Sequence, residues 1–482
     1  MIRSVASTLS GCKGVPSVLV AASPPPQCES VHGRRTGMSG QVATAPPAAR
    51  PGGERRVVAN VVRGSIGNLI EWYDWYAYTA FSVYFASAFF PKGDLTAQLL
   101  NSAGVFAIGF LMRPLGGWML GRYADRFGRR AALTLSVTLM AAGSLVIALT
   151  PTYASIGILA PALLLAARLV QGISVGGEYS TSATYLSEVA STGRRGFYSS
   201  FQYVTLVAGQ LTALGVQIVL QQVLSGEQMS EWGWRIPFVI GAVGALIVMW
   251  LRRGMDETDS YQKESASGSD QRGTVRALLR HPRECLLVVG LTLGGTVAFY
   301  TFTTYLQKFM VNTSGIDKGT VAWINFLALL VFLCVQPLAG ALSDRIGRRK
   351  LLLGFGVSGT LLTVPLLTLL SSTQNPVAAF ALMLAGLVIV TGYTSINAIV
   401  KAELFPTNIR ALGVGLPYAL TVAIFGGTAE FVGLWLKQAG NEPVFYWYVA
   451  GCVLVSLVVY LCMRETSQSS SLEDAPEPSG RS

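Results

Sequence analysis

Five ionisable side chains stand inside long apolar runs of the sequence: Glu71, Asp74, Arg113, Arg168 and Glu178. Ionisable groups are costly at membrane depth and therefore mark functional sites. A carboxylate there can bind a proton, and a guanidinium can grip a carboxylate through two parallel hydrogen bonds. The matching positions of the second half of the chain are largely uncharged, which predicts a proton or substrate site built by the first half.

Asp74 and Arg168 are both expected near the membrane midplane. At about 1.5 Å per residue, Asp74 lies about 16 Å and Arg168 about 18 Å from opposite faces of the membrane, whose apolar core is about 30 Å thick. When Asp74 is protonated, Arg168 would lose its partner and become free to bind an anion. The alternative is a permanent buried ion pair that only orders the helices.

Three further charges extend this interpretation. Glu71 precedes Asp74 by three residues and shares its helix face, and close carboxylates raise one another's proton affinity. Asp74 is the preferred proton carrier of the two. Arg113 and Arg168 could hold the two ends of a dicarboxylate, although Arg113 could instead pair with Glu71. Glu178, about 15 Å beyond Arg168, is expected in an inner gate.

Several other side chains are weaker candidates. The substrate could accept or donate hydrogen bonds at Tyr78, Gln171, Tyr300 and Tyr305, but each could also be a polar residue between packed helices. Arg235, within WGWRIP, could attract anions at the periplasmic mouth. Its alternative role is to anchor the helix at the membrane interface beside two tryptophans.

The elements that must position these residues are apolar helices. Of 482 residues 51% are hydrophobic and only 13% charged, with mean hydropathy +0.48. This composition excludes an ordinary soluble enzyme, a disulfide-rich secreted domain and a disordered protein. One spanning helix needs about 20 apolar residues, and twelve runs qualify: 63–90, 97–121, 131–150, 156–180, 197–224, 234–252, 284–310, 319–342, 350–371, 376–401, 411–437 and 444–463.

Polar segments divide the chain. We expect an extension that is disordered, a six-helix half, a basic cytoplasmic loop, a second six-helix half and a disordered tail, over residues 1–60, 61–252, 253–283, 284–463 and 464–482. The extension could contain a transit peptide, or the true start could be Met38. Most of the 36 Lys and Arg residues face the cytoplasm if both termini are cytoplasmic, as the positive-inside rule requires.

A repeat relates the two halves. GRYADRFGRR (121–130) and GALSDRIGRR (340–349) share the pattern G-x-x-x-D-R-x-G-R-R, 219 residues apart. A Glu precedes an Arg by seven residues in both halves, 215 residues apart. These loops predict a cytoplasmic gate of ion pairs, to which Glu178 is added: Asp125, Arg129, Glu188, Arg195, Asp344, Arg348, Glu403 and Arg410. The alternative is solvated pairs worth about 0–1 kcal/mol each.

Other chemistry finds no motif in the sequence. The phosphate-binding pattern G-x-x-x-x-G-K-[ST] is absent, so an ion gradient is the expected driving force. A single G-x-G-x-x-G at residues 354–359 lies within an apolar run and is better explained by helix packing. No Cys or His cluster suggests a metal, no cofactor is expected, and no nucleophile–base pair indicates an enzyme. The net charge of +11 fits basic cytoplasmic loops better than nucleic-acid binding.

The repeated loops resemble those of the major facilitator superfamily. The segments GNLIEWYDWYAY (67–78), GFLMRPLGG (109–117), RLVQGISVGGEYSTSATYLSEVA (168–190), GFYSSFQYVTL (196–206), EWGWRIPF (231–238), FYTFTTYLQK (299–308) and KAELFPTNIRALGVG (401–415) resemble its metabolite:proton symporter branch. The resemblance covers nearly all of residues 60–463 and implies an all-α polytopic membrane protein with twelve transmembrane helices.

The resemblance also implies a function. It suggests a monomeric carrier in the bacterial inner membrane that imports a dicarboxylate, in the first place 2-oxoglutarate (alpha-ketoglutarate), with protons by alternating access. Citrate, shikimate and proline or betaine are the alternative substrates. The short tail without heptads weighs against an osmosensing member of the branch. A sensor that does not transport is a remote alternative.

Overall fold

The structure is a computed structural model that describes residues 52–90, 93–127, 129–176, 193–252, 278–405 and 409–466. The regular elements within these ranges are all helices. Helix α1 (Gly52–Phe89) begins before the expected boundary, so the last nine residues of the extension expected to be disordered are helical. Residues 1–51, 253–277 and 467–482 lie outside the described part of the chain.

Within its described residues, the first half of the chain forms six long helical segments. These are α1, α2 (Leu95–Leu111) continued by α3 (Arg113–Phe127), α4 (Arg129–Leu149), α6 (Leu159–Val175), α8 (Arg195–Val223) and α10 (Ile236–Arg252). Short helices in two connections were not expected: α5 (Tyr153–Ile156), α9 (Gly226–Glu231) and the 3₁₀ turn η1 (Gly233–Arg235).

The described part of the second half forms six more segments. They are α13 (Pro282–Tyr300) continued by η2 (Thr301–Tyr305) and α14 (Leu306–Asn312), α15 (Lys318–Ile346), α16 (Arg348–Ser372), α17 (Pro376–Thr394) with α18 (Asn397–Leu404), α19 (Arg410–Thr421) continued by η3 (Val422–Gly426) and α20 (Ala429–Gln438), and α21 (Glu442–Cys462). Both η2 and η3 are π-helical, a form that is rare and frequent at functional sites.

These segments confirm the predicted all-α polytopic membrane fold. In the described residues nine helices are long and apolar enough to cross a membrane. Two shorter apolar helices, Thr134–Leu149 and Leu159–Val175, and the long helix α1 complete the twelve. The predicted runs agree with the observed helices to within a few residues at most ends.

Local sequence explains where several helices begin and break. Asp94 accepts a hydrogen bond from the Ala97 amide and caps α2, and Asp317 does the same for α15. Such caps satisfy backbone donors that have no partner inside the helix. The second segment breaks at Met112 because Pro114 has no N–H to donate one turn back. This break places Arg113 at the start of α3.

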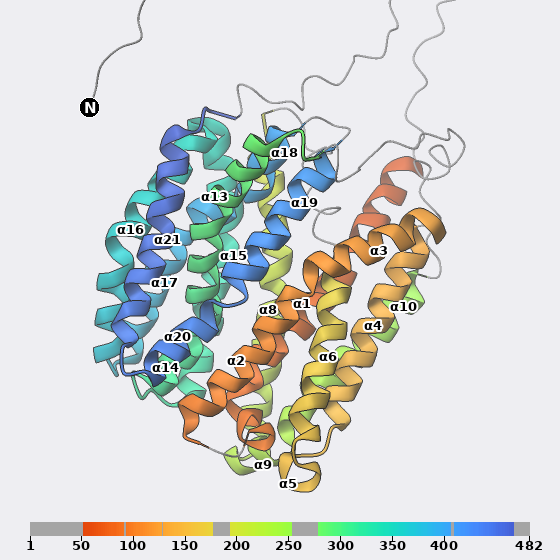
Figure 1. The fold of residues 1–482 in the computed structure, drawn as a ribbon, viewed down its shortest axis with the longest axis vertical. Coiled ribbons are helices and arrows are strands. Elements are labelled where there is room, and N and C mark those ends of the chain that lie inside the picture. Colours follow the sequence, from red (N-terminus) through yellow and green to blue (C-terminus); the bar gives the residue numbers. More distant parts are fainter. Residues whose placement is uncertain are drawn as a thin grey trace, which may run out of the picture. The chain divides into compact units, whose positions relative to one another are not determined.

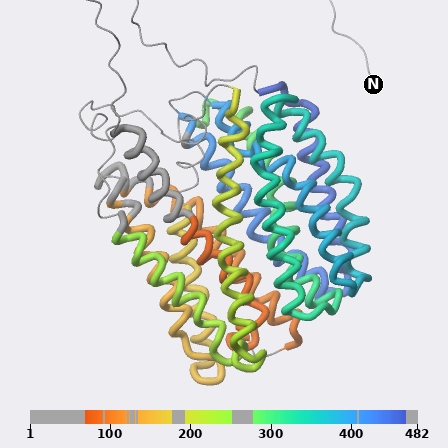
Figure 2. Tube along the Cα trace, turned by 180° about the vertical axis from the view of Figure 1, so that it is seen from behind, coloured from red at the N-terminus to blue at the C-terminus, as the bar shows by residue number. Residues whose placement is uncertain are grey.

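Helices pack mainly within their own half, and two long helices join the halves. In the first half α4 contacts α6 and α10, and in the second half α16 contacts α17 and α21. Helices α8 and α15 lie along each other, as both views show (Figures 1 and 2). The first group of polar residues described below is buried between α1, α4 and α6, and the second lies between α8 and α15.

Candidate functional site

Asp74 is completely buried in α1, and both of its carboxylate oxygens accept hydrogen bonds. The Ser144 hydroxyl of α4 donates to Oδ1 at 2.5 Å, and the Gln171 amide of α6 donates to Oδ2 at 2.6 Å. The same Gln171 nitrogen donates to the Ser144 hydroxyl at 2.9 Å. Three helices therefore converge on one carboxylate.

Gln171 also connects this carboxylate to Arg168. The Arg168 guanidinium donates from Nη1 to the Gln171 side-chain oxygen at 2.8 Å. The expected direct ion pair is therefore corrected: a neutral amide stands between the two charges and bonds to both. A change at Asp74 can reach Arg168 through the orientation of this amide as well as through the direct interaction of the two charges.

Two glycines make room for this arrangement. A methyl group on Gly241 of α10 would lie 2.2 Å from Asp74 Oδ1, which is far inside van der Waals contact. One on Gly143 of α4 would lie 2.5 Å from Cγ of Gln171. Only a residue without a side chain lets these neighbouring helices close over the polar group.

Both arginines lie on aromatic rings, and they share Trp75. The guanidinium carbon of Arg168 is 4.0 Å from the Trp75 ring centroid, and that of Arg113 is 4.7 Å from it. The separation of the two guanidinium carbons therefore cannot exceed the sum of these distances. Cation–π contacts hold the cations without using their N–H donors.

Those donors remain available to an anion. In both Arg113 and Arg168 the Nε and Nη2 atoms are buried and have no hydrogen-bond partner among the described residues. Buried donors without partners cost free energy that a bound carboxylate would recover. Arg113 stacks on Phe110, Trp72 and Trp75, and its pairing with Glu71 stays an alternative.

Glycine contacts between α2–α3 and α6 set the positions of the two arginines. A methyl group on Gly172 would lie 2.0 Å from the Gly109 carbonyl oxygen, and one on Gly176 would lie 2.1 Å from that of Arg113. Small residues allow such close approach of membrane helices. The backbones that carry Arg113 and Arg168 are thus in direct contact.

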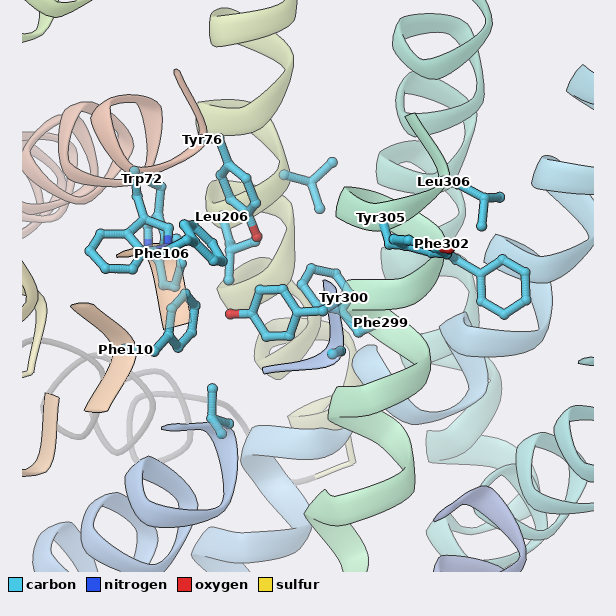
Figure 3. Packing of buried hydrophobic residues seen from close by; sticks show 14 of the residues in the cluster. Trp72, Tyr76, Phe106, Phe110, Leu206, Phe299, Tyr300, Phe302, Tyr305 and Leu306 are labelled. Carbon is cyan, nitrogen blue, oxygen red and sulfur yellow. The ribbon is translucent and has the colours of Figure 1, made fainter. Parts of the chain in front are cut away.

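Tyr78 and Tyr300 border the arginines. The Arg168 guanidinium carbon lies 4.3 Å from the Tyr78 ring centroid, and the Tyr78 hydroxyl donates to the Ser102 carbonyl at 2.9 Å. Tyr300 packs against Phe110, with ring centroids 5.2 Å apart (Figure 3). Its hydroxyl interacts with the positive charge of the Arg113 guanidinium.

Two other candidates lie apart from this cluster. The Tyr305 hydroxyl donates to Glu442 of α21 at 3.1 Å, and Figure 3 shows its ring on the far side of Tyr300 from Phe110. Arg235 donates from Nη1 to the carbonyls of Ala148 and Thr150, both at 2.7 Å. It thereby holds the end of α4, and its guanidinium carbon lies 4.4 Å from the Trp234 ring centroid; both roles predicted for it stay predictions.

Glu71 is buried and directed toward different partners. Its Oε1 accepts a hydrogen bond from the Ser174 hydroxyl at 3.3 Å. The Ser174 and Ser136 hydroxyls are 2.9 Å apart, which ties this carboxylate to α6 and α4. Glu71 and Asp74 therefore contact different hydroxyls although they share a helix face.

A second polar cluster joins the two halves at the end of the bundle that carries the repeated loops. Asp344 accepts hydrogen bonds from the backbone amides of Gly196 (2.8 Å) and Phe197 (3.0 Å) in α8. Arg348 donates to the same carboxylate at 2.7 Å and lies 3.8 Å from Glu403. The carboxylate thus caps a helix of the other half, where it also stabilises the helix dipole.

The other predicted gate residues are only partly visible. Arg410 donates to the carbonyls of Ala402 and Phe405, both at 3.2 Å, and Arg195 lies within electrostatic range of Glu403. Glu178 and Glu188 lie outside the described residues. The side chains of Asp125 and Arg129 also lie outside the description.

The sequence interpretation missed charges in the second half. Lys308 of α14 and Glu430 of α20 form an ion pair with side-chain exposures of 1% and 2%. Lys401 is also fully buried, and its ammonium lies 3.5 Å from the Tyr418 ring centroid. The sequence analysis singled out five charges of the first half, and these three buried charges of the second half add to them. The available signal was that both members of the pair fall inside predicted apolar runs.

No metal site is visible in the described ranges, where no group of three His, Cys, Asp or Glu side chains is placed to bind an ion. The polar groups of the described interior are carboxylates, guanidiniums, ammoniums, amides and hydroxyls. Such groups can bind protons and anions.

Comparison with known proteins agrees with this architecture. The model of the Major Facilitator Superfamily matches residues 65–416 and 299–479. The alpha-ketoglutarate permease of Escherichia coli (strain K12) is 51% identical over 435 residues, which cover 90% of this chain and 100% of the relative. The citrate-proton symporter of Salmonella typhi is 33% identical over 403 residues, 82% of this chain and 92% of the relative.

A solved structure shares the fold. The xylose transporter XylE from E. coli, in a partially occluded inward-open conformation, superimposes with a TM-score of 0.63 at 18% identity, covering 88% of this chain and 99% of that chain. The twelve helical segments of the described residues, the charges buried among them and the match of the family model lead to one conclusion. The chain belongs to the Major Facilitator Superfamily.

Proposed function

We propose that this protein imports 2-oxoglutarate together with protons across the bacterial inner membrane, with both termini in the cytoplasm. The observation that carries the proposal is the hydrogen-bonded chain from Asp74 through Gln171 to Arg168. It connects a group that can bind a proton to a group that can bind an anion. The 51% identity to a permease named for alpha-ketoglutarate supports the choice of substrate.

In the proposed cycle a proton binds Asp74 first. A neutral carboxyl is a weaker acceptor than a carboxylate, so the Gln171 amide is held less firmly and Arg168 is released from it. Arg113 and Arg168 then bind the two carboxylates of the substrate through their N–H donors, with Tyr78 and Tyr300 at the edges. Protonation of Asp74 thus favours binding of the anion, and this couples uptake of the substrate to the proton gradient.

Alternating access follows from the repeat. We propose that residues 61–252 and 284–463 rock as two halves, joined by the loop 253–283, around a site near the midplane. The cluster around Asp344 and Arg348 is the cytoplasmic gate and holds the halves together while the carrier is open to the periplasm. One chain supplies every group named here, so the proposed working unit is a monomer.

Two cations near Trp75 favour a substrate with two negative charges. A zwitterion such as proline or betaine has one carboxylate and would leave one arginine uncompensated. Citrate carries three carboxylates, and shikimate carries one. The pair of arginines therefore favours a dicarboxylate over these alternatives.

Uptake into proteoliposomes tests the proposal. Labelled 2-oxoglutarate should accumulate under an imposed inward proton gradient without sodium, and a protonophore should abolish the accumulation. Absence of uptake would refute the substrate, and citrate, shikimate and betaine would then be tried in the same vesicles. Uptake that requires sodium would refute proton coupling.

Asp74→Asn tests the proton site. The amide cannot exchange a proton, so gradient-driven accumulation should fall to the background, while exchange of internal for external substrate continues. Accumulation at the parent level would contradict the role of Asp74. Exchange that is lost together with accumulation would place Asp74 in binding instead of coupling.

A further inference from the structure

The residues that follow the last transmembrane helix are ordered against the gate. Residues 464–482 were expected to form a disordered tail, but Glu465 and Thr466 make specific contacts and Thr466 is buried. Both lie beside the Arg348–Glu403 part of the gate. The expectation is therefore corrected for the first residues of this segment.

Glu465 caps the helix that carries the gate arginine. Its Oε1 accepts from the backbone amide of Arg348 at 2.9 Å, and its Oε2 accepts from that of Arg349 at 3.1 Å. These are the first two residues of α16, whose terminal amides have no partner within the helix. A carboxylate at this position also stabilises the helix dipole. Gly347, with φ of 96°, turns the chain there and leaves room for the carboxylate.

Arg349 reinforces the same contact. Its Nη2 donates to the Leu461 carbonyl at 2.6 Å and its Nε donates to the Tyr460 carbonyl at 3.1 Å. These carbonyls lie in the last turn of α21, just before Glu465. The end of α21 and the start of α16 are therefore bonded in both directions.

Thr466 reaches the gate glutamate itself. Its hydroxyl donates to Glu403 Oε2 at 2.5 Å, while the other oxygen of Glu403 faces Arg348. Arg348 bonds to Asp344, and Asp344 bonds to the amides at the start of α8. A continuous polar path thus runs from the tail to the contact between the two halves.

We propose that Glu465 and Thr466 are positioning residues of the cytoplasmic gate, which they hold in its closed arrangement by fixing the start of α16 and the Glu403 carboxylate. The proposal rests on the proposed alternating-access function, because a gate has meaning only in a carrier. It predicts that loss of either contact shifts the population toward the inward-open state.

Thiol accessibility measures that shift without any substrate. Ser200 of α8 is fully buried beside Gly340, so a Ser200→Cys reporter in a cysteine-free chain reports opening of the cytoplasmic side. Asn312→Cys, at the opposite end beside Thr96, reports opening of the periplasmic side. Each is labelled with a membrane-impermeant maleimide, in inside-out and right-side-out vesicles respectively.

Glu465→Ala should raise the labelling rate of Ser200→Cys about tenfold, as expected for lost charge-assisted hydrogen bonds. A chain ending at Arg464 should show at least the same increase. Labelling of Asn312→Cys should stay equal or fall, because the two sides open alternately. A merely loosened protein would label faster at both positions, which would overturn the proposal.

Two further variants complete the test. Thr466→Val keeps the shape of the side chain, loses one hydroxyl and should raise Ser200→Cys labelling about threefold. A chain ending at Thr466 keeps both contacts and should label like the parent. If Glu465→Ala fails to fold, Thr466→Val decides, and parent-like labelling overturns the proposal. Because labelling needs no substrate, its failure is distinguishable from failure of the 2-oxoglutarate proposal.

Discussion

At the scale of single residues, the side-chain amide of Gln171 links the charges of Asp74 and Arg168. Gln171 donates to Asp74 and accepts from Arg168, so it senses both. A direct ion pair would instead have occupied N–H donors of Arg168 for as long as Asp74 stayed ionised. The indirect link leaves Nε and Nη2 of Arg168 unpartnered among the described residues and lets protonation act through a small rotation.

Gln171→Leu should uncouple the two charges. Leucine fills a similar volume but neither donates nor accepts, so Asp74 loses one of its two donors and Arg168 loses its acceptor. We expect accumulation under a proton gradient to fall at least tenfold, while 2-oxoglutarate still binds, with Kd changed less than accumulation. Uptake and equilibrium binding in the same vesicles measure both quantities.

Gln171→Glu is the informative companion. It keeps the length of the side chain but adds a charge beside Asp74, so it should pair with Arg168 and weaken binding of the anion. Equal effects of the two variants on binding would contradict the bridging role. The matched control is Gln221→Leu, which removes an amide that donates to the Tyr84 hydroxyl and takes no part in the hydrogen bonds that link Asp74, Gln171 and Arg168.

The residue scale also shows the limits of sequence reasoning. The midplane depth of Asp74 and Arg168 stays a prediction, whereas their nearness to each other, now seen through Gln171, followed from helix rise alone. The bridging amide did not, since it depends on side-chain conformations and on the space left by Gly241 and Gly143. That space is created by residues from two other helices, whose packing no local pattern encodes.

At the scale of helices, the ion pair between Lys308 and Glu430 ties α14 to α20. Each of these half-helices follows a π-helical segment, η2 or η3, in which the ordinary ladder is interrupted. The sequence predicted one continuous apolar helix in each place and could not locate the interruption. A buried pair beyond each interruption gives the two half-helices a common attachment.

Removing one charge of this pair should lower the stability of the protein more than removing both charges. Lys308→Met or Glu430→Gln leaves one buried charge without its partner, a change that costs about 3–5 kcal/mol in folded proteins. The double variant Lys308→Met/Glu430→Met removes both charges and should recover much of the loss. Thermal unfolding of the purified protein in detergent should therefore give lower Tm for each single variant than for the double variant.

Transport separates structure from function in the same series. If the pair serves only stability, the double variant should recover transport together with its Tm. If the pair also takes part in the cycle, the double variant stays inactive although its Tm recovers. A double variant less stable than both singles would contradict the assignment of a compensated buried pair.

At the scale of the whole molecule, the two halves are held together near the repeated loops by backbone contacts as well as charges. The Ile399 amide of α18 donates to the Ser199 hydroxyl of α8 at 3.0 Å, and Asn397 donates to the Tyr203 hydroxyl at 3.1 Å. The loop repeat predicted charged gate residues at this end. Contacts through small hydroxyls and backbone amides carry no such signature and could not be predicted.

Linking the halves at this contact should stop the cycle. In a cysteine-free chain, Ser199→Cys with Ile399→Cys should cross-link under a short thiol-specific reagent and lose transport. Reduction should restore it, because the halves must separate here for the carrier to open inward. Each single cysteine variant treated with the same reagent is the control, and unchanged transport in the cross-linked protein would contradict the two-half cycle.

The shared ring of Trp75 has a consequence for which acids the carrier accepts. Both guanidiniums contact the same indole, with their carbons 4.0 and 4.7 Å from its centroid, so their separation is limited to the sum of two short ring contacts. If each guanidinium holds one carboxylate, the distance between the guanidiniums sets the distance between carboxylates that fits the site. The carrier would then sort diacids by the number of carbons between their ends, and a longer or shorter homologue would reach only one arginine at a time.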